Sequence, residues 1–178
     1  MKPNSPRTTS SAGAFTLIEV VLALGVATFC LLTVFALLPI GLTSNQASLQ
    51  QTMAADISSA IMADLRSAQP LSPGTSPRFG FSIPAAGATT TISSAPQTIY
   101  LAASGSATTV SGTPVTSGSA ASRYRATLGF APPSNTGQRT ATTVRVLITW
   151  PALADANPSQ WPTNYTGSYE AATTLDRN

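Results

Sequence analysis

Apolar residues form one long run near the start of the chain. Across residues 15–38 the only charged side chain is Glu19. A helix over this run would span roughly 36 Å at about 1.5 Å per residue, which exceeds the roughly 30 Å hydrocarbon core of a bilayer. The pattern therefore predicts a transmembrane helix over residues 15–41.

Pro39 and Gly41 follow the apolar run and predict a helix break near the outer membrane face, because Pro removes a backbone hydrogen bond and Gly loosens the chain. We expect this break to be a kink at Pro39 within a single helix over residues 16–69. Helical spacing then resumes over residues 42–69, which predicts an amphipathic helix whose apolar stripe needs a cover. Pro70 and Pro73 end this helix. The stripe consists of Leu49, Met53, Ile57, Ala60, Ile61, Leu65 and Ala68.

The apolar period changes from 3.6 to 2 in the remainder, residues 70–178. Alternation over 122–130 and 143–150 predicts two strands with one face inward, and 78–83, 97–103 and 168–175 are weaker candidates. We expect an α+β fold in which the long N-terminal helix packs on a small antiparallel sheet of three to five strands. The inward residues of the two clear strands are Tyr124, Ala126, Leu128, Phe130, Val144, Val146, Ile148 and Trp150.

Residues 1–14 are polar and carry only the positive charges of Lys2 and Arg7. They predict a leader peptide that stays in the cytoplasm by the positive-inside rule, with the outer domain on the other side of the membrane. A cleaved secretory signal is the alternative. Its apolar core is normally shorter and contains no acid.

Composition excludes several kinds of chemistry. The chain has no His, so the common Ser/His/Asp and Cys/His constellations and imidazole metal sites cannot form. Cys30 is the single cysteine, so no disulfide can form within the chain. The net charge is +3, and two of the positive residues lie in the leader, so the remaining charge does not predict nucleic-acid binding. We expect no enzyme, no metal site and no cofactor, because the acids outside the apolar run are isolated and are predicted to be solvated charges on the helix and in loops: Asp56, Asp64, Asp155, Glu170 and Asp176.

An acid inside an apolar run is a functional candidate whose partner must be found. If the chain is cut before Phe15, the new amino terminus is positive and Glu19 becomes its fifth residue. A stiff helix hinders pairing within one chain, whereas a neighbour shifted along the axis could pair its terminal ammonium with this carboxylate. Because an unpaired buried charge is expensive, Glu19 is predicted to set the register between subunits as an assembly residue.

The stretch "AFTLIEVVLALGVA" resembles the amino-terminal methylation motif of the type IV pilin superfamily, which includes type II secretion pseudopilins. The resemblance implies a pilin-like fold and a prepilin peptidase that cuts at the processing site Gly13, Ala14, Phe15 and methylates the new N-terminal residue, Phe15. The acid at the family's fifth position corresponds to Glu19. The family usually has Gly before the cut, and here Ala14 occupies that place. A cut after Gly13 would make the acid sixth, so the cut before Phe15 is favoured.

The same resemblance implies partners and a location. The partners are the prepilin peptidase, other pilin-like subunits, an inner-membrane assembly platform and, before assembly, membrane lipid. The chain would cross the bacterial inner membrane once, with its N-terminus cytoplasmic and its outer domain periplasmic, and then enter a pilus or pseudopilus. It has neither the cysteine pair of many major pilins nor an acidic cluster like that of the major pseudopilin. The leading interpretation is a minor pilin or pseudopilin. Together with "LLPIGL" and "VLITWPA", the motif is similar to the Verru_Chthon cassette protein B group of pilin-like proteins.

The alternative is a single-pass anchored module that never polymerises and acts as an adhesin or binds DNA. Arg123, Arg125 and Arg145 could share the outward face of adjacent strands and touch phosphates. We expect instead an ordinary solvated strand face, with no nucleic acid bound.

Overall fold

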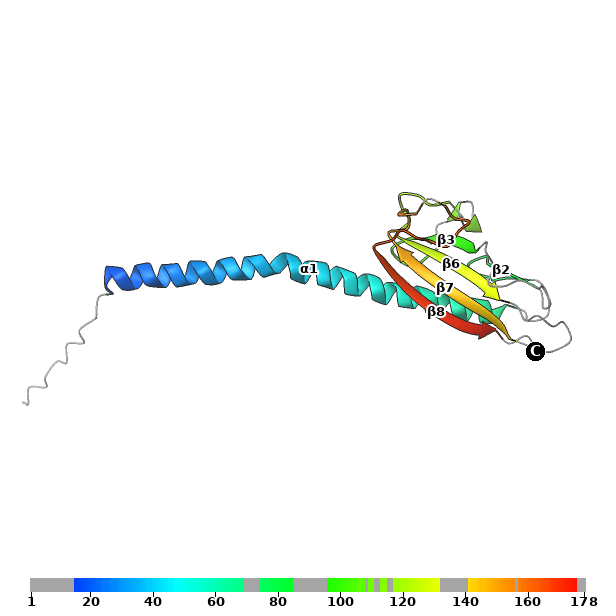
Figure 1. Ribbon diagram of the computed structural model, residues 1–178, viewed down its shortest axis with the longest axis horizontal. Coiled ribbons are helices and arrows are strands. Elements are labelled where there is room, and N and C mark those ends of the chain that lie inside the picture. Colours follow the sequence, from blue (N-terminus) through cyan, green and yellow to red (C-terminus); the bar gives the residue numbers. More distant parts are fainter. Residues whose placement is uncertain are drawn as a thin grey trace, which may run out of the picture. The chain divides into compact units, whose positions relative to one another are not determined.

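The computed structural model describes residues 15–68, 74–84, 96–107, 109–110, 113–114, 117–131, 141–155 and 157–175. The chain forms two compact units, Met1–Gln46 and Ala47–Asn178, and the long helix contributes to both. The described elements (Figure 1) are α1 Leu17–Ser67, β1 Gly74–Thr75, β2 Ser82–Ile83, β3 Gln97–Leu101, β4 Thr109–Val110, β5 Thr113–Pro114, β6 Tyr124–Ala131, β7 Thr142–Trp150 and β8 Gly167–Leu175.

In the first unit the apolar side chains of α1 are exposed. Large hydrophobic residues from Phe15 to Leu42 have no cover among the described residues. By its length and composition α1 could cross a membrane. The first unit is therefore a helix whose apolar surface still needs a partner or a lipid environment.

The single helix predicted over residues 16–69 is confirmed as α1, which continues through Pro39 and Gly41. Pro39 removes one backbone hydrogen bond, but the bonds before and after it still hold the helix. Thr43 Oγ1 donates to the carbonyl oxygens of Pro39 (3.1 Å) and Ile40 (3.0 Å). Gly41 costs about 1 kcal/mol of helix propensity relative to Ala, which is too little to end a long helix.

The second unit contains a four-stranded sheet in the order β3-β6-β7-β8, with every neighbouring pair antiparallel. Leu128 faces Val146 and Ala126 faces Ile148, so the apolar positions of β6 and β7 lie opposite each other. β1 pairs with β2, and β4 pairs with β5, in separate two-stranded sheets. The predicted antiparallel sheet is confirmed.

The part of α1 after Gln46 covers one face of the four-stranded sheet (Figure 1). Ile57, Ile61 and Leu65 of the predicted stripe are buried there, together with Ala54, whereas Leu49 remains exposed. Burial of each large aliphatic side chain contributes about 1.5–3 kcal/mol. The expected α+β layout, a long N-terminal helix packed on a small antiparallel sheet, is confirmed. The sheet side of this core is formed by Ile99, Leu101, Tyr124, Ala126, Leu128, Phe130, Val144, Val146, Ile148, Trp150 and Leu175.

Asp64 attaches the segment after α1 to the helix. Its carboxylate accepts backbone hydrogen bonds from Arg78 (3.0 and 3.2 Å) and Phe79 (3.0 Å). These N–H groups are therefore not available to a strand partner, and only Ser82–Ile83 of the expected strand at 78–83 forms β2. Asp64 is nearly buried, so the sequence-based view of it as a solvated helix charge is wrong.

Candidate functional site

Glu19 lies in the first turn of α1, where it and Thr16 satisfy each other's polar groups. Oε2 of Glu19 accepts hydrogen bonds from the backbone N–H of Thr16 (3.0 Å) and from its hydroxyl (2.9 Å). The N–H of Glu19 lies 3.4 Å from Thr16 Oγ1, which accepts from it. This capping box supplies partners for N–H groups that a helix start leaves free. No donor among the described residues contacts Oε1 of Glu19.

The carboxylate of Glu19 lies on one face of the first turns of α1. Glu19 shares the face with Phe15, Ala23 and Ala27, which follow the four-residue spacing of a helix. The two alanines leave the helix backbone open to close approach by another helix. Phe15 is exposed. The other residues of the predicted processing site, Gly13 and Ala14, lie outside the described residues, as does the rest of the predicted leader, 1–14.

The second candidate was the arginine group of Arg123, Arg125 and Arg145, and the structure does not bring it together. Arg123 is exposed, Arg145 is partly exposed, and the side chain of Arg125 is only 1% exposed. The expectation that Arg125 lies on a solvated face is wrong, because carbonyl groups of residues 155, 157 and 160 enclose its guanidinium. The side chains of these three residues therefore offer no common surface for phosphate groups.

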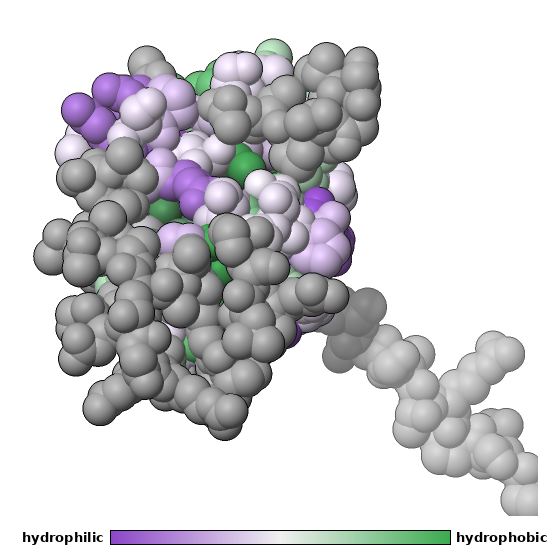
Figure 2. Space-filling model, turned by 90° about the vertical axis from the view of Figure 1, so that its right-hand side faces the viewer, coloured by the Kyte–Doolittle hydropathy of each residue, from purple (hydrophilic) through white to green (hydrophobic). Residues whose placement is uncertain are grey.

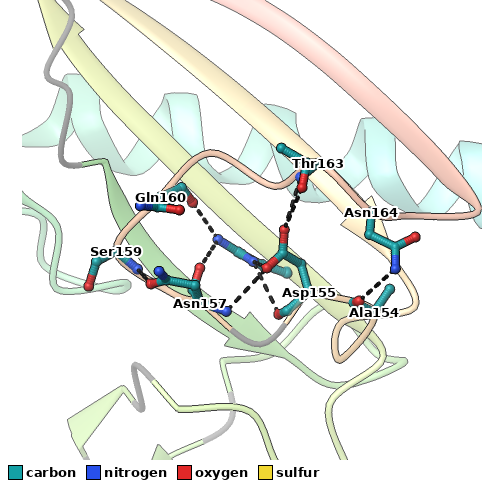
Figure 3. A network of polar contacts seen from close by, with 8 residues as sticks. Ala154, Asp155, Asn157, Ser159, Gln160, Thr163 and Asn164 are labelled. Carbon is teal, nitrogen blue, oxygen red and sulfur yellow. Dashed lines mark hydrogen bonds and ion pairs between the residues drawn. The ribbon is translucent and has the colours of Figure 1, made fainter.

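The guanidinium of Arg125 is held by backbone carbonyl groups of the β7–β8 connection (Figure 3). Nη2 donates to the carbonyl oxygens of Asn157 (2.9 Å) and Gln160 (2.6 Å), and Nη1 donates to that of Asp155 (3.3 Å). The Asp155 carboxylate lies 4.0 Å from Nη1. A planar guanidinium with several fixed donors suits such a set of acceptors. Arg125 therefore organises this connection from the inside.

Asp155 and Asn157 shape the same connection by local hydrogen bonds. Oδ1 of Asp155 accepts from the N–H of Asn157 (3.2 Å), and Oδ1 of Asn157 accepts from the N–H of Ser159 (3.0 Å). Oδ2 of Asp155 accepts from the N–H of Thr163 (2.9 Å). The backbone N–H groups of Thr163 and Asn157 lower the pKa of Asp155, with a smaller contribution from the Arg125 charge.

Arg145 pairs with Glu170 on the neighbouring strand. Its Nε lies 2.6 Å and its Nη2 3.0 Å from the two carboxylate oxygens of Glu170, a bidentate geometry. The guanidinium carbon also lies 4.5 Å from the centre of the Trp161 ring. The hydrogen bond from Arg145 lowers the pKa of Glu170. This cation therefore already has partners within its own chain.

The described residues show no metal-binding cluster, and the domain end in Figure 2 shows no large hydrophobic patch. No group of three or more His, Cys, Asp or Glu residues in the described ranges could hold a metal ion. On the domain end shown in Figure 2, hydrophobic described residues are visible only as small separate areas between hydrophilic ones. The start of α1, where an acid lies in an exposed apolar segment, is thus the strongest candidate site among the described residues.

Sequence reasoning missed three polar features, and two of them left a signal. Thr16 and Glu19 have the spacing of a capping box before an apolar run. Asp64 lies three residues after Ile61 and seven after Ile57, a spacing that places it beside the apolar stripe. The burial of Arg125 had no comparable signal, because the residues that bind it follow 30 to 35 positions later.

Comparison with models of known protein families, with curated proteins and with solved structures found no match.

Proposed function

We propose that the chain is a pilin-like structural subunit, a minor pilin or pseudopilin. In this proposal the prepilin peptidase removes residues 1–14 and methylates Phe15. The helix is stored in the bacterial inner membrane, with the sheet domain in the periplasm, and then enters a type IV pilus or a type II secretion pseudopilus. Its work is assembly with other subunits, and it catalyses no reaction.

The observation that carries this proposal is the exposed apolar part of α1, up to Leu42, with a single acid, Glu19, in its first turn. Thr16 uses Oε2 of Glu19, while Oε1 has no donor among the described residues. A terminal ammonium from a neighbouring subunit could bind Oε1 without displacing Thr16. Since an unpaired charge inside an apolar bundle costs several kcal/mol, such a pair would favour one axial register over all others.

The first test separates docking by charge from helix capping. Glu19→Gln keeps an oxygen that can accept from Thr16 but removes the charge, whereas Glu19→Ala removes both. We expect the amount of each variant in sheared filaments to fall at least about tenfold. The lost charge pair is worth several kcal/mol, and about 1.4 kcal/mol already corresponds to a factor of ten. Normal incorporation of Glu19→Gln with loss of Glu19→Ala would assign the residue to capping alone, and normal incorporation of both would reject the docking role.

The second test examines processing and location. Mass spectrometry of the native protein should find a chain that begins with methylated Phe15. A chain that retains Met1 would overturn the proposal. Shearing of cells gives an independent result, since complete retention of processed protein in the membrane would indicate an anchored module that does not polymerise.

A further inference from the structure

β8 is a long sheet edge that remains open among the described strands. It pairs with β7 through nine consecutive register positions, Gly167–Leu175, and no described strand pairs with its other edge (Figure 1). The side chains before Leu175 alternate between exposed and partly exposed. β3, at the opposite edge of the sheet, is buried from Thr98 to Leu101. Within the part of the chain that the structure describes, only β8 therefore offers a long row of main-chain groups to another strand.

The strand lacks the features that usually keep a sheet edge from pairing. It contains neither Lys nor Pro, and its register with β7 runs without a bulge. Its only charged residue is Glu170, whose carboxylate is bound by Arg145 on β7 (2.6 and 3.0 Å). An edge with these properties is suited to the addition of a strand.

We propose that the partner at this edge is β8 of a second copy, in an antiparallel pair about a two-fold axis perpendicular to the sheet. Antiparallel pairing is the arrangement that all four strands of this sheet already use. Because an isologous interface uses the same surface on both copies, one open edge is sufficient. The interface closes at two copies, so it goes beyond the proposed filament function and does not rest on it.

The sequence of β8 favours one register for this pair. The strand has nine residues with Ala171 at its centre, so complete overlap places Ala171 opposite its own copy. Tyr169 then faces Thr173, and Glu170 faces Ala172, so each large side chain meets a smaller one. A register centred on Glu170 would instead place two carboxylates directly opposite each other, which is destabilising.

The same register brings opposite charges of the two copies together. Arg145 lies opposite Ala172 within one chain, and Glu170 of the second copy would lie on the other side of Ala172. The two charged residues are then two strand spacings apart, roughly 10 Å between main chains, with only a methyl side chain between them. Arg145 uses Nε and Nη2 for its own Glu170, so Nη1 can donate to the second carboxylate. Each carboxylate is then near one guanidinium of each copy, which favours a second copy as the partner.

Disulfide trapping of the full-length chain in detergent tests this pairing, in a Cys30→Ala background. Ala171→Cys lies on the two-fold axis, so oxidation should join two copies of this variant. Ser168→Cys and Thr174→Cys in one chain should also give a cross-linked dimer, because these positions face each other across the axis. One of the two contacts is a hydrogen-bonded pair and the other is not, with Cα atoms about 5.5 and 4.5 Å apart, and both distances allow a disulfide.

Matched controls use single cysteines that the axis keeps apart. Thr173→Cys lies on the same face as Ala171→Cys, but its two copies would be at least roughly 14 Å apart. Ser168→Cys alone and Thr174→Cys alone are farther from their own copies, so none of the three should cross-link. A dimer from Thr173→Cys as abundant as that from Ala171→Cys would indicate random collision and would overturn the pairing. No dimer from either Ala171→Cys or the double variant would overturn it as well.

Sedimentation of the full-length chain in detergent measures the dimer without cross-linking. Ala172→Glu places a carboxylate opposite Glu170 of the second copy, twice in each dimer, and should raise the dissociation constant about threefold or more. Ala103→Glu, an exposed change in a turn, should leave this constant unchanged. A parent chain that is monomeric at every concentration would overturn the proposal, and an unchanged constant in Ala172→Glu would place the contact elsewhere and also overturn it. None of these results depends on the Glu19 variants, which test the proposed function separately.

Discussion

Nη2 of Arg125 lies 2.6 Å from the carbonyl oxygen of Gln160, which is 35 residues later in the chain. This contact joins the second strand of the sheet to the connection between the last two strands. The side chain that makes it is almost completely buried. The connection therefore depends on a single internal cation, and this dependence can be measured.

Replacement of Arg125 by Met should lower the free energy of unfolding by about 3 kcal/mol, because buried carbonyl groups lose their donors. Arg125→Lys should recover only part of this, since a single ammonium cannot match the planar fork. Urea unfolding of the full chain in detergent measures the effect. Arg123→Met is the control, because that neighbouring arginine is exposed and should change stability by no more than about 0.5 kcal/mol. Equal losses for the two methionine variants would contradict the role of Arg125.

Asp155 should make the stability of the sheet domain depend on pH in the acid range. Its pKa is lowered in the folded chain, chiefly by the N–H groups of Thr163 and Asn157. As the pH falls below the ordinary aspartate pKa of about 3.9, the unfolded chain binds the proton first, so stability is lost until the pH passes the lowered pKa. The stabilisation is fully present above the ordinary value.

The test compares unfolding of the parent with that of Asp155→Asn between neutral and strongly acidic pH. We expect the variant to be less stable at neutral pH and the difference to shrink with acidification. Asp56→Asn, an exposed change on α1, should follow the parent curve. A constant difference between Asp155→Asn and the parent at all pH values would refute the role assigned to the carboxylate.

Asp64→Ala should lower the free energy of unfolding by about 2 kcal/mol, because the N–H groups of Arg78 and Phe79 lose their acceptor. The N–H of Phe79 should also exchange with solvent faster, which hydrogen exchange detects. Asp56→Ala removes a carboxylate from the exposed side of the same helix and should have little effect. If the N–H of Phe79 keeps its protection in Asp64→Ala, the proposed attachment is wrong.

Gly167→Ala should disturb the packing of Trp150. A Cβ atom at Gly167 would lie 2.4 Å from the indole ring, which packs edge-to-face on Tyr124 at 6.1 Å between ring centres. We expect a loss of about 1–3 kcal/mol from overpacking and a shift in Trp150 fluorescence, measured in a Trp161→Phe background. Gly41→Ala is the control, since nothing lies within 4 Å of its added Cβ. Unchanged emission and stability in Gly167→Ala would show that the ring has room to move.

The helix and the two strands with the clearest apolar alternation could be predicted because their signals are local. A continuous apolar run and a period of 2 depend only on neighbours in the sequence. These signals identified α1 and the inner faces of β6 and β7. The helix continues through Pro39, as predicted, because one missing hydrogen bond is small beside the many others in the same helix.

The site at the start of α1 was also accessible from the sequence. Glu19 is conspicuous in an apolar run, and its spacing from Thr16 contains the capping box. What the acid pairs with in an assembly is a property of two or more chains, so neither this sequence nor one folded copy contains it. The proposed pairing therefore depends on the experiments with Glu19.

By itself the sequence determined α1, β6 and β7 and the inner face of each, because apolar periodicity reports which residues must leave water. It could not determine what covers the polar face of β6. Arg125 and the partly exposed Arg145 both alternate with apolar residues in the same way, yet only Arg125 is enclosed by the carbonyl groups of Asp155, Asn157 and Gln160. Only the tertiary structure decided this difference, because hydrogen bonds between distant segments depend on where the chain returns in space.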